Sequence, residues 1–441
     1  MKLDIVVLGA GPAGLGAGYR LAEQTGAKWL IFEAEGRVGG LSSSRIDAKG
    51  FTWDIGGHVI FSQNAFFNNV VERALGPDAL THTRESYIRT AGRFIPFPLQ
   101  NNIHRLPPRA MRECFEGLIA IEQRGKSPQP AHFGDWIPWR LGDGISRHFM
   151  LPYNNKLWAY PIEKMGHYWI NDRISVPKSS EIEKSLKIKV DNHSWGPNAT
   201  FRFSRNGGTG SLFANIASRF SPHIALHHKA VRVDAKRKTV TFKNGKKVSY
   251  GSLITTAPLD HFVKKMIAAP EPDILHAASG LKHNSGFVVG IGINRFIKNS
   301  RCWIYFPDPA VPFYRVTYFS NYSPLNVPRP GAQTSFMCEI SSGVTQKRNA
   351  STIVKETVVG LVKSGLMRPD DRRRIASAWM MKVPYLYPIP TLTRDASLAP
   401  IEMFLRQHNI SSVGRFGGWR YEAGNMDHSF MAGHEAASAL M

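Results

Sequence analysis

The chain has few cysteines and lacks any long hydrophobic run. Its 441 residues contain three cysteines, and this odd, sparse set argues against both a disulfide framework and a zinc site. The apolar run at residues 5–8 is too short for a signal-peptide core, and no stretch approaches the roughly 20 residues of a membrane span. We therefore expect a globular cytoplasmic protein without stable membrane insertion or a metal centre.

Acidic residues are scarce compared with basic ones. The chain has 56 Lys and Arg against 33 Asp and Glu, which gives a net charge of +23. Nucleic acid, a membrane surface or small polyanionic ligands could each explain such an excess. The densest runs are residues 236–238 and 243–247, around an Asn244-Gly245 turn, and residues 372–374. Because no RNA-recognition or helix-turn-helix pattern accompanies them, we expect no nucleic-acid binding and a surface that attracts nucleotide ligands.

The chain opens with the pattern of a dinucleotide-binding unit. An apolar strand at 4–8 leads into a glycine-rich turn at 9–14, and a helical stretch follows to about residue 23. A second strand at 29–32 ends at Glu33, 19 positions after Gly14. Strand, GxGxxG turn, helix, strand and acid in this order form the βαβ dinucleotide fingerprint. The sequence therefore predicts a Rossmann-like domain.

Each position in this pattern has a physical role. Gly9 permits the tight turn, Gly11 lets the backbone approach a pyrophosphate at the helix N-terminus, and Gly14 lets helix and strand pack closely. Glu33 is placed to accept hydrogen bonds from the adenosine ribose. An arginine and paired glycines after the acid, with a later Gly-Gly-His turn, favour FAD over NAD. The candidate FAD-binding residues here are Gly9, Gly11, Pro12, Ala13, Gly14, Glu33, Arg37, Gly39, Gly40, Leu41, Gly56, Gly57 and His58.

We expect the flavin site to be completed by the C-terminal end of the chain. Residues 414–419 are predicted to form a strand and turn, and residues 424–429 lead into a helix over 430–440. Free N–H groups at a helix N-terminus can stabilise negative charge on a reduced flavin. The alternative is a packed terminal helix with a polar cap. The candidates in this segment are Arg415, Gly424, Asn425 and Met426.

The middle of the chain changes character twice. Helical periodicity at 111–123, 133–141 and 145–158 predicts an inserted helical domain. Alternating segments at 286–293, 303–306, 314–320 and 335–341 predict an antiparallel sheet that floors a substrate cavity. The expected fold class is α/β, with a Rossmann-like FAD-binding domain (1–80, 205–285, 408–441), a helical domain with a mobile lid (101–190) and an antiparallel sheet substrate domain (81–100, 191–204, 286–407).

Several long strings resemble one family, the UDP-galactopyranose mutases, and its eukaryotic-type branch most. They are GGHVIFS at 56–62, FMLPYN at 149–154 with Trp158, WGPNATFRF at 195–203, PFYR at 312–315 with SNYSP at 320–324, and RFGGWRYEAGN at 415–425. The resemblance implies a flavoprotein with an amine-oxidase-like Rossmann domain that converts UDP-galactopyranose to UDP-galactofuranose for galactofuranose biosynthesis. It also implies that N5 of the reduced flavin attacks the anomeric carbon, expels UDP and forms a covalent adduct without net redox change.

The same resemblance implies roles for individual residues. Arg173 and Arg315 bind the pyrophosphate, where a planar guanidinium matches the oxygens of the departing diphosphate. His58 lies beside flavin N5 and completes the catalytic set, while Val231 belongs to the cofactor site. NADPH is the implied reductant, through Arg84, Ser86 and Arg415. The implied contacts to the nucleotide sugar are Phe97, Leu99, Gln100, Phe149, Tyr153, Asn154, Trp158, Asn198, Trp303, Tyr305, Tyr322, Tyr387 and Tyr421, together with the two arginines. Segments 170–177 and 195–200 are expected to be lids.

Some positions leave alternatives open. The family usually has Tyr-Pro-Phe-Gln in its uracil pocket, whereas this chain has Phe97-Pro98-Leu99-Gln100, so a mutase for another nucleotide sugar is one alternative. Trp158 could be a core residue and Asn154 a polar cap. The helical domain is the candidate surface for a homo-oligomer.

Two other classes of protein compete with the mutase interpretation. A flavin oxidoreductase of the amine oxidase or protoporphyrinogen oxidase type shares the FAD fold, but its site favours an apolar tunnel over two arginines. A non-catalytic FAD module would use the positive charge to bind nucleic acid or an acidic membrane, without turnover.

Overall fold

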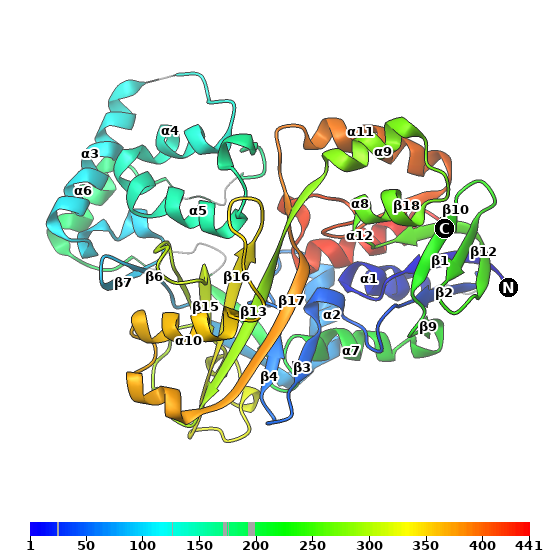
Figure 1. The fold of residues 1–441 in the computed structure, drawn as a ribbon, viewed down its shortest axis with the longest axis horizontal. Helices are drawn as coiled ribbons and strands as arrows, with labels where there is room; N and C mark the ends of the chain where they lie inside the picture. Colours follow the sequence, from blue (N-terminus) through cyan, green and yellow to red (C-terminus); the bar gives the residue numbers. More distant parts are fainter. Residues whose placement is uncertain (24–25, 126, 171–173, 175, 193–198) are drawn as a thin grey trace.

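The computed structural model describes residues 1–23, 26–125, 127–170, 174, 176–192 and 199–441 (Figure 1). Its first sheet, within these residues, has seven strands in the order β10-β11-β12-β1-β2-β9, with β18 beside the end of β12. β1 lies between β2 and β12 and is parallel to both, as the βαβ fingerprint requires. The strands are β1 (Lys2–Leu8), β2 (Trp29–Phe32), β9 (Ile224–Ala225), β10 (Ala230–Asp234), β11 (Thr239–Phe242), β12 (Lys247–Thr255) and β18 (Ile410–Ser412).

Helices cover both faces of this sheet because successive residues of its central strand, β1, are apolar and point to opposite faces. Val6 and Leu8 face one core, whereas Ile5 and Val7 face the other. The second core is shared with α1 (Pro12–Leu21), α2 (Ala65–Leu75), α7 (Gly210–Ser218) and α12 (Met426–Ser438). The first core is shared with α8 (Leu259–His261), α9 (Pro272–Gly280) and α11 (Arg394–Gln407).

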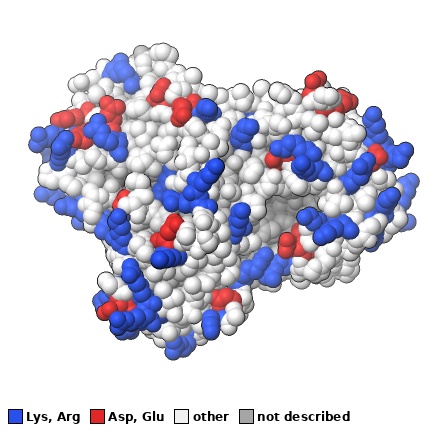
Figure 2. All heavy atoms as spheres, in the orientation of Figure 1, with Lys and Arg blue, Asp and Glu red and all other residues white. Residues whose placement is uncertain are grey.

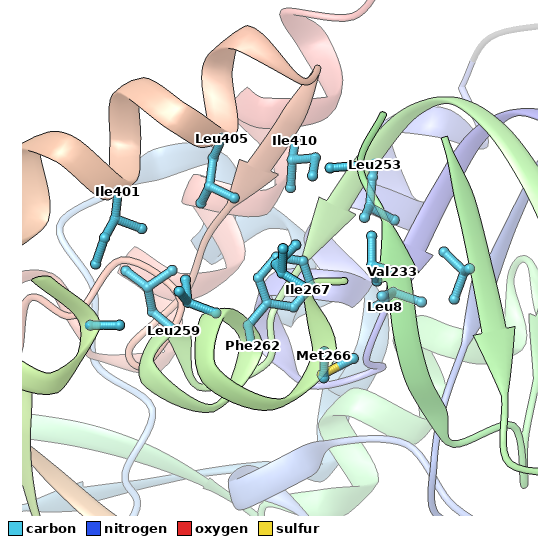
Figure 3. Packing of buried hydrophobic residues seen from close by; sticks show 14 of the residues in the cluster. Leu8, Val233, Leu253, Leu259, Phe262, Met266, Ile267, Ile401, Leu405 and Ile410 are labelled. Atoms are coloured by element: carbon cyan, nitrogen blue, oxygen red, sulfur yellow. The ribbon is translucent and has the colours of Figure 1, made fainter. Parts of the chain in front are cut away.

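Figure 3 shows part of the first core. Ile401 and Leu405 of α11 face Leu259 and Phe262, and Ile410 of β18 lies beside them. The expected boundary of 286–407 groups α11 with the substrate sheet, but its apolar face packs on the Rossmann-like side. Periodicity alone identifies a helix and does not say which sheet it covers.

The second sheet lies in the middle of the molecule (Figure 1). Its order is β17-β13-β16-β15-β14-β6-β7, antiparallel throughout except that β14 runs parallel to β6. The predicted antiparallel sheet is therefore confirmed, and β6 and β7 form one edge of it, within the residues 81–100 expected to belong to this domain. The strands are β6 (Ser86–Thr90), β7 (Arg93–Pro96), β13 (Lys282–Ile293), β14 (Trp303–Tyr305), β15 (Arg315–Tyr318), β16 (Thr334–Ser342) and β17 (Ile375–Ile389), and α10 (Ile353–Lys363) packs with them.

A small hairpin joins the two sheets. It is formed by β3 (Ser44–Ile46) and β4 (Thr52–Asp54), and its Trp53 ring lies directly over Gly290 of β13. A Cβ on Gly290 would fall 2.5 Å from that ring, so glycine is required for this contact. A second pair, β5 (Ala79–Thr83) and β8 (Thr200–Ser204), lies beside the same layer.

The predicted helical segment forms a separate lobe at one end of the molecule (Figure 1). It contains α3 (Pro108–Arg124), α4 (Phe133–Ile145), α5 (Leu151–Trp158) and α6 (Ser179–Ile188). The helix expected over 145–158 is not uniform, because a π-helical turn at Ser146–Met150 precedes α5. No helix of the described residues is long and apolar enough to cross a membrane.

The C-terminal segment differs in detail from its prediction. The strand expected at 414–419 is β18, which ends at Ser412, and residues 414–419 form the following turn. α12 begins at Met426 instead of residue 430, with Asn425 in extended conformation at its N-cap. α1 ends at Leu21, two residues earlier than expected.

Candidate active site

A cavity of about 320 Å³ lies at the glycine-rich turn after β1. Gly9 has φ +98°, and a Cβ there would fall 2.1 Å from Thr256 Oγ1. Gly11 lies open to the cavity, because the atom nearest to a Cβ placed on it would be Gly40 Cα, at 3.8 Å. Gly14 packs so closely that a Cβ would fall 1.8 Å from the carbonyl oxygen of Gly9. These three conformations are those a backbone needs to receive a pyrophosphate.

Glu33 is held at the edge of this cavity. Its carboxylate accepts hydrogen bonds from the backbone N–H of Ala10 at 2.6 Å and of Glu35 at 2.8 Å. Burial raises the pKa of Glu33, and the two backbone hydrogen bonds oppose the rise. The carboxylate is thereby oriented before any ligand arrives, as the predicted ribose contact requires.

Two helices begin at the same cavity. A Cβ on Gly433 of α12 would fall 1.8 Å from the backbone oxygen of Ala13 in α1, so the two helices pack backbone against backbone. Ala13 and Met426, one near the start of each helix, both line the cavity. Two sets of free N–H groups therefore converge on it, which suits a diphosphate and an anionic flavin ring.

Two predicted cofactor residues lie away from this cavity. Arg37 is exposed and donates to the carbonyl of Ser44 at 3.3 Å. Val231 is 38% exposed on β10. Most of the others line the cavity or support its wall, with Gly39 N–H bonded to the carbonyl of Ala10 at 2.7 Å, whereas Gly56, Gly57 and Asn425 line a neighbouring compartment.

A second compartment, of about 350 Å³, continues the first one, and Figure 2 shows the molecule hollowed between its two sheets. Leu41, His58, Tyr385, Arg415 and Met426 line both compartments. The second compartment brings together these predicted residues from five separate parts of the chain: Gly56, Gly57, His58, Arg84, Arg315, Tyr387, Tyr421, Arg415 and Asn425.

Arg315 is locked in place by a carboxylate that sequence reasoning missed. Arg315 on β15 and Glu339 on β16 are direct cross-strand partners. Arg315 Nε and Nη2 donate to the two Glu339 oxygens at 2.6 and 2.7 Å, and Tyr314 Oη and Gly57 N–H donate at 2.9 and 3.1 Å. Burial raises the pKa of Glu339, but the charge and hydrogen bonds of Arg315 outweigh it, so the net shift is downward. The available signal was the single charged residue in the strand predicted at 335–341, because a charge at a buried strand position needs a partner.

His58 is a neutral imidazole in this compartment. Burial, with Arg415 and Arg315 nearby, lowers its pKa to about 4, against a smaller opposing effect of Glu339. Its Nδ1 is buried and has no hydrogen-bond partner among the described residues. A bound flavin, with several polar ring atoms, would meet this orphaned atom, so the residues fit the cofactor.

The predicted tyrosines occupy two depths. Tyr387 and Tyr421 line the compartment, and their ring centroids are 5.7 Å apart. Burial raises the pKa of Tyr387 to about 12, so its hydroxyl stays a hydrogen-bond donor. Tyr322 is buried deeper among Phe201, Phe203 and Phe319, and its hydroxyl has no partner within the described part of the chain.

Four residues implied to contact the nucleotide sugar form an aromatic group next to the compartment, and one of them, Phe97, belongs to the implied uracil pocket. The Phe97 ring lies 5.0 Å from that of Tyr305 and 6.4 Å from that of Phe149, and Tyr153 lies 5.4 Å from Tyr305. Leu99 and Gln100 are buried at the following turn, after a cis Phe97-Pro98 bond.

Asn154 and Trp158 pair with each other. Trp158 Nε1 donates to Asn154 Oδ1 at 3.2 Å, and Asn154 Nδ2 donates to the carbonyl of Met150 at 2.8 Å. Trp158 is fully buried between Trp169, Tyr387 and Tyr421. This arrangement supports the wall of the site from behind.

Of the residues implied for NADPH, Arg84 and Arg415 line the compartment, and Ser86 is fully buried. The Arg84 guanidinium is 5.1 Å from the Trp303 ring centroid, and Ser86 is directly opposite Trp303 in the sheet. Arg415 Nε donates to the carbonyl of Gly424 at 2.7 Å. Arg173 and Asn198 lie outside the described residues.

Arg394 fixes the loop that carries Tyr421. It is 2% exposed, donates to both oxygens of Glu422 at 2.8 Å, and lies 4.5 Å from the Tyr168 ring centroid. Tyr421 precedes Glu422 in the short helix Tyr421–Ala423. The buried guanidinium thus ties the substrate compartment to α11.

Arg394→Met is expected to destabilise the protein by about 3 kcal/mol, because it removes the partner of Glu422 and leaves that carboxylate partly buried. We also expect weaker UDP binding, since Tyr421 loses its anchor. Thermal melting and a UDP titration measure both effects. Arg406→Met, an exposed change on the same helix, is the matched control; equal melting temperatures for the two variants would contradict the anchoring role.

Comparison with known proteins agrees with this geometry. Residues 7–73 match the model of an NAD(P)-binding Rossmann-like domain. A crystal structure of reduced UDP-galactopyranose mutase superposes with a TM-score of 0.95 at 38% identity, covering 99% of this chain and 93% of that one. A protein proposed to be a protoporphyrinogen oxidase from Exiguobacterium sp. 255-15 gives 0.74 at 14% identity, over 99% and 98%. Cyclohexylamine oxidase from Brevibacterium oxydans IH-35A gives 0.69 at 14%, over 100% and 99%; these last two share the fold alone.

The Rossmann-like sheet, the glycine cradle and the two-part cavity define an FAD-binding flavoenzyme. The match to the mutase covers 99% of this chain, including the second sheet, which contributes Arg315, Glu339 and Tyr387 to the second compartment. The chain belongs to the UDP-galactopyranose mutase family, which confirms the resemblance found in its sequence.

Proposed function

We propose that this flavoenzyme is an isomerase that interconverts the pyranose and furanose forms of a nucleotide sugar, with UDP-galactose as the expected substrate. The observation that carries the proposal is a compartment with a partly exposed, oriented arginine and two tyrosines, continuous with the dinucleotide cavity. An amine oxidase site would need an apolar space there. The amine-oxidase-like neighbours share the fold at 14% identity or less and support this alternative less well.

The residues divide the work as follows. Arg315, pre-oriented by Glu339, binds the diphosphate and stabilises the charge that it gains on leaving. Tyr421 donates a hydrogen bond to the same group, and Tyr387 does so by turning its proton away from the Tyr314 hydroxyl, which lies 3.1 Å away. His58 stays neutral beside the cofactor, so it can accept or donate one hydrogen bond without adding charge. The FAD held at Gly11 and Glu33 supplies, when reduced, the nucleophile for the sugar.

Turnover of UDP-galactofuranose tests this proposal directly. The yellow protein is incubated anaerobically with the substrate, with and without dithionite, and products are separated by chromatography. We expect UDP-galactopyranose only with reduced flavin and without consumption of reductant. Conversion of only a different nucleotide sugar would show that the enzyme is a mutase for that sugar and not for UDP-galactose. Oxidation of an amine without isomerisation would overturn the proposal.

We further propose NADPH as the reductant, through Arg84, Ser86 and Arg415. Arg84 lies over Trp303 at the edge of the compartment, and a guanidinium suits a 2′-phosphate. Arg84→Ala is expected to slow flavin bleaching by NADPH about tenfold or more, while bleaching by dithionite keeps its rate. Stopped-flow absorbance at the flavin band measures both; equal slowing with the two reductants would remove Arg84 from the NADPH site.

A further inference from the structure

One end of the molecule carries a concentration of charge that the active site does not use. Residues 229–247, here called the basic ribbon, run through β10, β11 and the start of β12 and contain eight Lys or Arg but a single acid, Asp234. The ribbon therefore supplies +7 of the net charge of +23 in 19 residues. Neither compartment of the active-site cavity is lined by any of them.

The charges of the basic ribbon are displayed to solvent and are not neutralised. Seven of the eight basic side chains are exposed: Lys229, Arg232, Lys236, Arg237, Lys243, Lys246 and Lys247. None of the seven has a carboxylate within 4.0 Å among the described residues. Figure 2 shows Lys and Arg gathered at the end of the molecule where Figure 1 places β10 and β12, opposite the helical lobe. Because no acidic side chains of the described residues neutralise it, the basic ribbon forms a positive patch that is complementary to an extended polyanion.

We propose that the basic ribbon docks the enzyme on an anionic phospholipid bilayer. Six of its eight basic residues are lysines, whose flexible point charges suit a diffuse layer of headgroups better than the fixed fork of arginine. Val231, which is 38% exposed, places an apolar side chain among them, beside Arg232. The only aromatic residue of the basic ribbon, Phe242, is 1% exposed, so the ribbon has no exposed ring on which nucleic-acid bases could stack.

The expected strength of this docking follows from the number of charges. Each basic residue near an anionic surface strengthens association about fivefold at physiological salt, so three of them contribute about 100-fold. The attraction is screened within a Debye length, and high salt should therefore release the enzyme. Docking of this kind is peripheral and leaves the active-site cavity between the two sheets uncovered.

The experiment is co-sedimentation of the FAD-loaded enzyme with vesicles of phosphatidylcholine alone or mixed with phosphatidylglycerol, at low and high salt. Lys243→Glu/Lys246→Glu/Lys247→Glu changes the ribbon, and Arg372→Glu/Arg373→Glu/Arg374→Glu, in an exposed turn, changes the net charge by the same amount. We expect the native enzyme and the control variant to bind the mixed vesicles only, and the ribbon variant to bind them about 100-fold or more weakly. Turnover should be unchanged in both variants.

Three outcomes would overturn the proposal. The native enzyme could fail to bind anionic vesicles. The two triple variants could also lose binding equally, which would make net charge the cause. RNA or duplex DNA could also displace the vesicles and depend more strongly on the ribbon, which would identify nucleic acid as the partner.

Discussion

Arg315→Ala is expected to weaken UDP binding about 100-fold while FAD stays bound, because a charge-assisted, pre-oriented contact to the diphosphate is lost. Arg315 has its Nε and Nη2 committed to Glu339, which fixes the plane of the guanidinium toward the compartment. Binding energy is therefore not spent on ordering a long side chain when the substrate arrives. Isothermal titration with UDP and the flavin absorbance of the purified variant measure the two quantities.

The same substitution should also lower stability, and this effect must be separated from binding. Without Arg315, Glu339 is a buried carboxylate whose charge is uncompensated, which costs about 3–5 kcal/mol. Arg315→Ala/Glu339→Gln removes both charges, so we expect it to recover most of the melting temperature without recovering UDP affinity. If UDP affinity returned together with stability, Arg315 would be a structural residue only.

The pair also predicts a direction of pH dependence. The pKa of Glu339 is lowered in the folded protein, so its contribution to stability is present above the unfolded pKa and is lost as pH falls through the folded value. The native enzyme should therefore lose stability in acid more steeply than the double variant. Melting temperatures across the acid range check this comparison, and parallel curves would contradict it.

The parts of the site that sequence could predict are those set by local chain geometry. The turn at Gly9, Gly11 and Gly14 depends only on residues close together in the sequence, and Glu33 follows at the end of the next parallel strand. The spacing of these four residues is therefore enough to place them. The Arg315–Glu339 pair depends instead on the register of β15 against β16, which no local pattern specifies. Asn154 and Trp158 are four residues apart and therefore share a face of α5, but their mutual hydrogen bond depends on packing.

His58→Ala is expected to reduce kcat by about 100-fold or more with little change in FAD content, because positioning of the reacting groups is lost while the cofactor cradle at Gly11 and Glu33 is untouched. His58 is partly exposed to the compartment, but its Nδ1 is buried and unpartnered among the described residues, beside Arg415 and Arg315. A structural histidine would have that nitrogen satisfied by the protein. Flavin content by absorbance and turnover by chromatography distinguish the two roles, and a variant with normal kcat would make His58 structural.

The pH profile of the native enzyme provides an independent check on His58. Its pKa is lowered to about 4, so the ring is neutral throughout the neutral range and kcat should show no inflection near the ordinary histidine value of about 6.5. The unfolded chain binds a proton on this ring at a higher pH than the folded protein does, so stability should fall as the pH drops from about 6.5 toward about 4. His58→Phe, which cannot be protonated, should flatten that part of the stability curve. An inflection of kcat near the ordinary value, abolished in His58→Phe, would mean that the ring is charged during turnover and would assign it proton transfer in place of neutral contact.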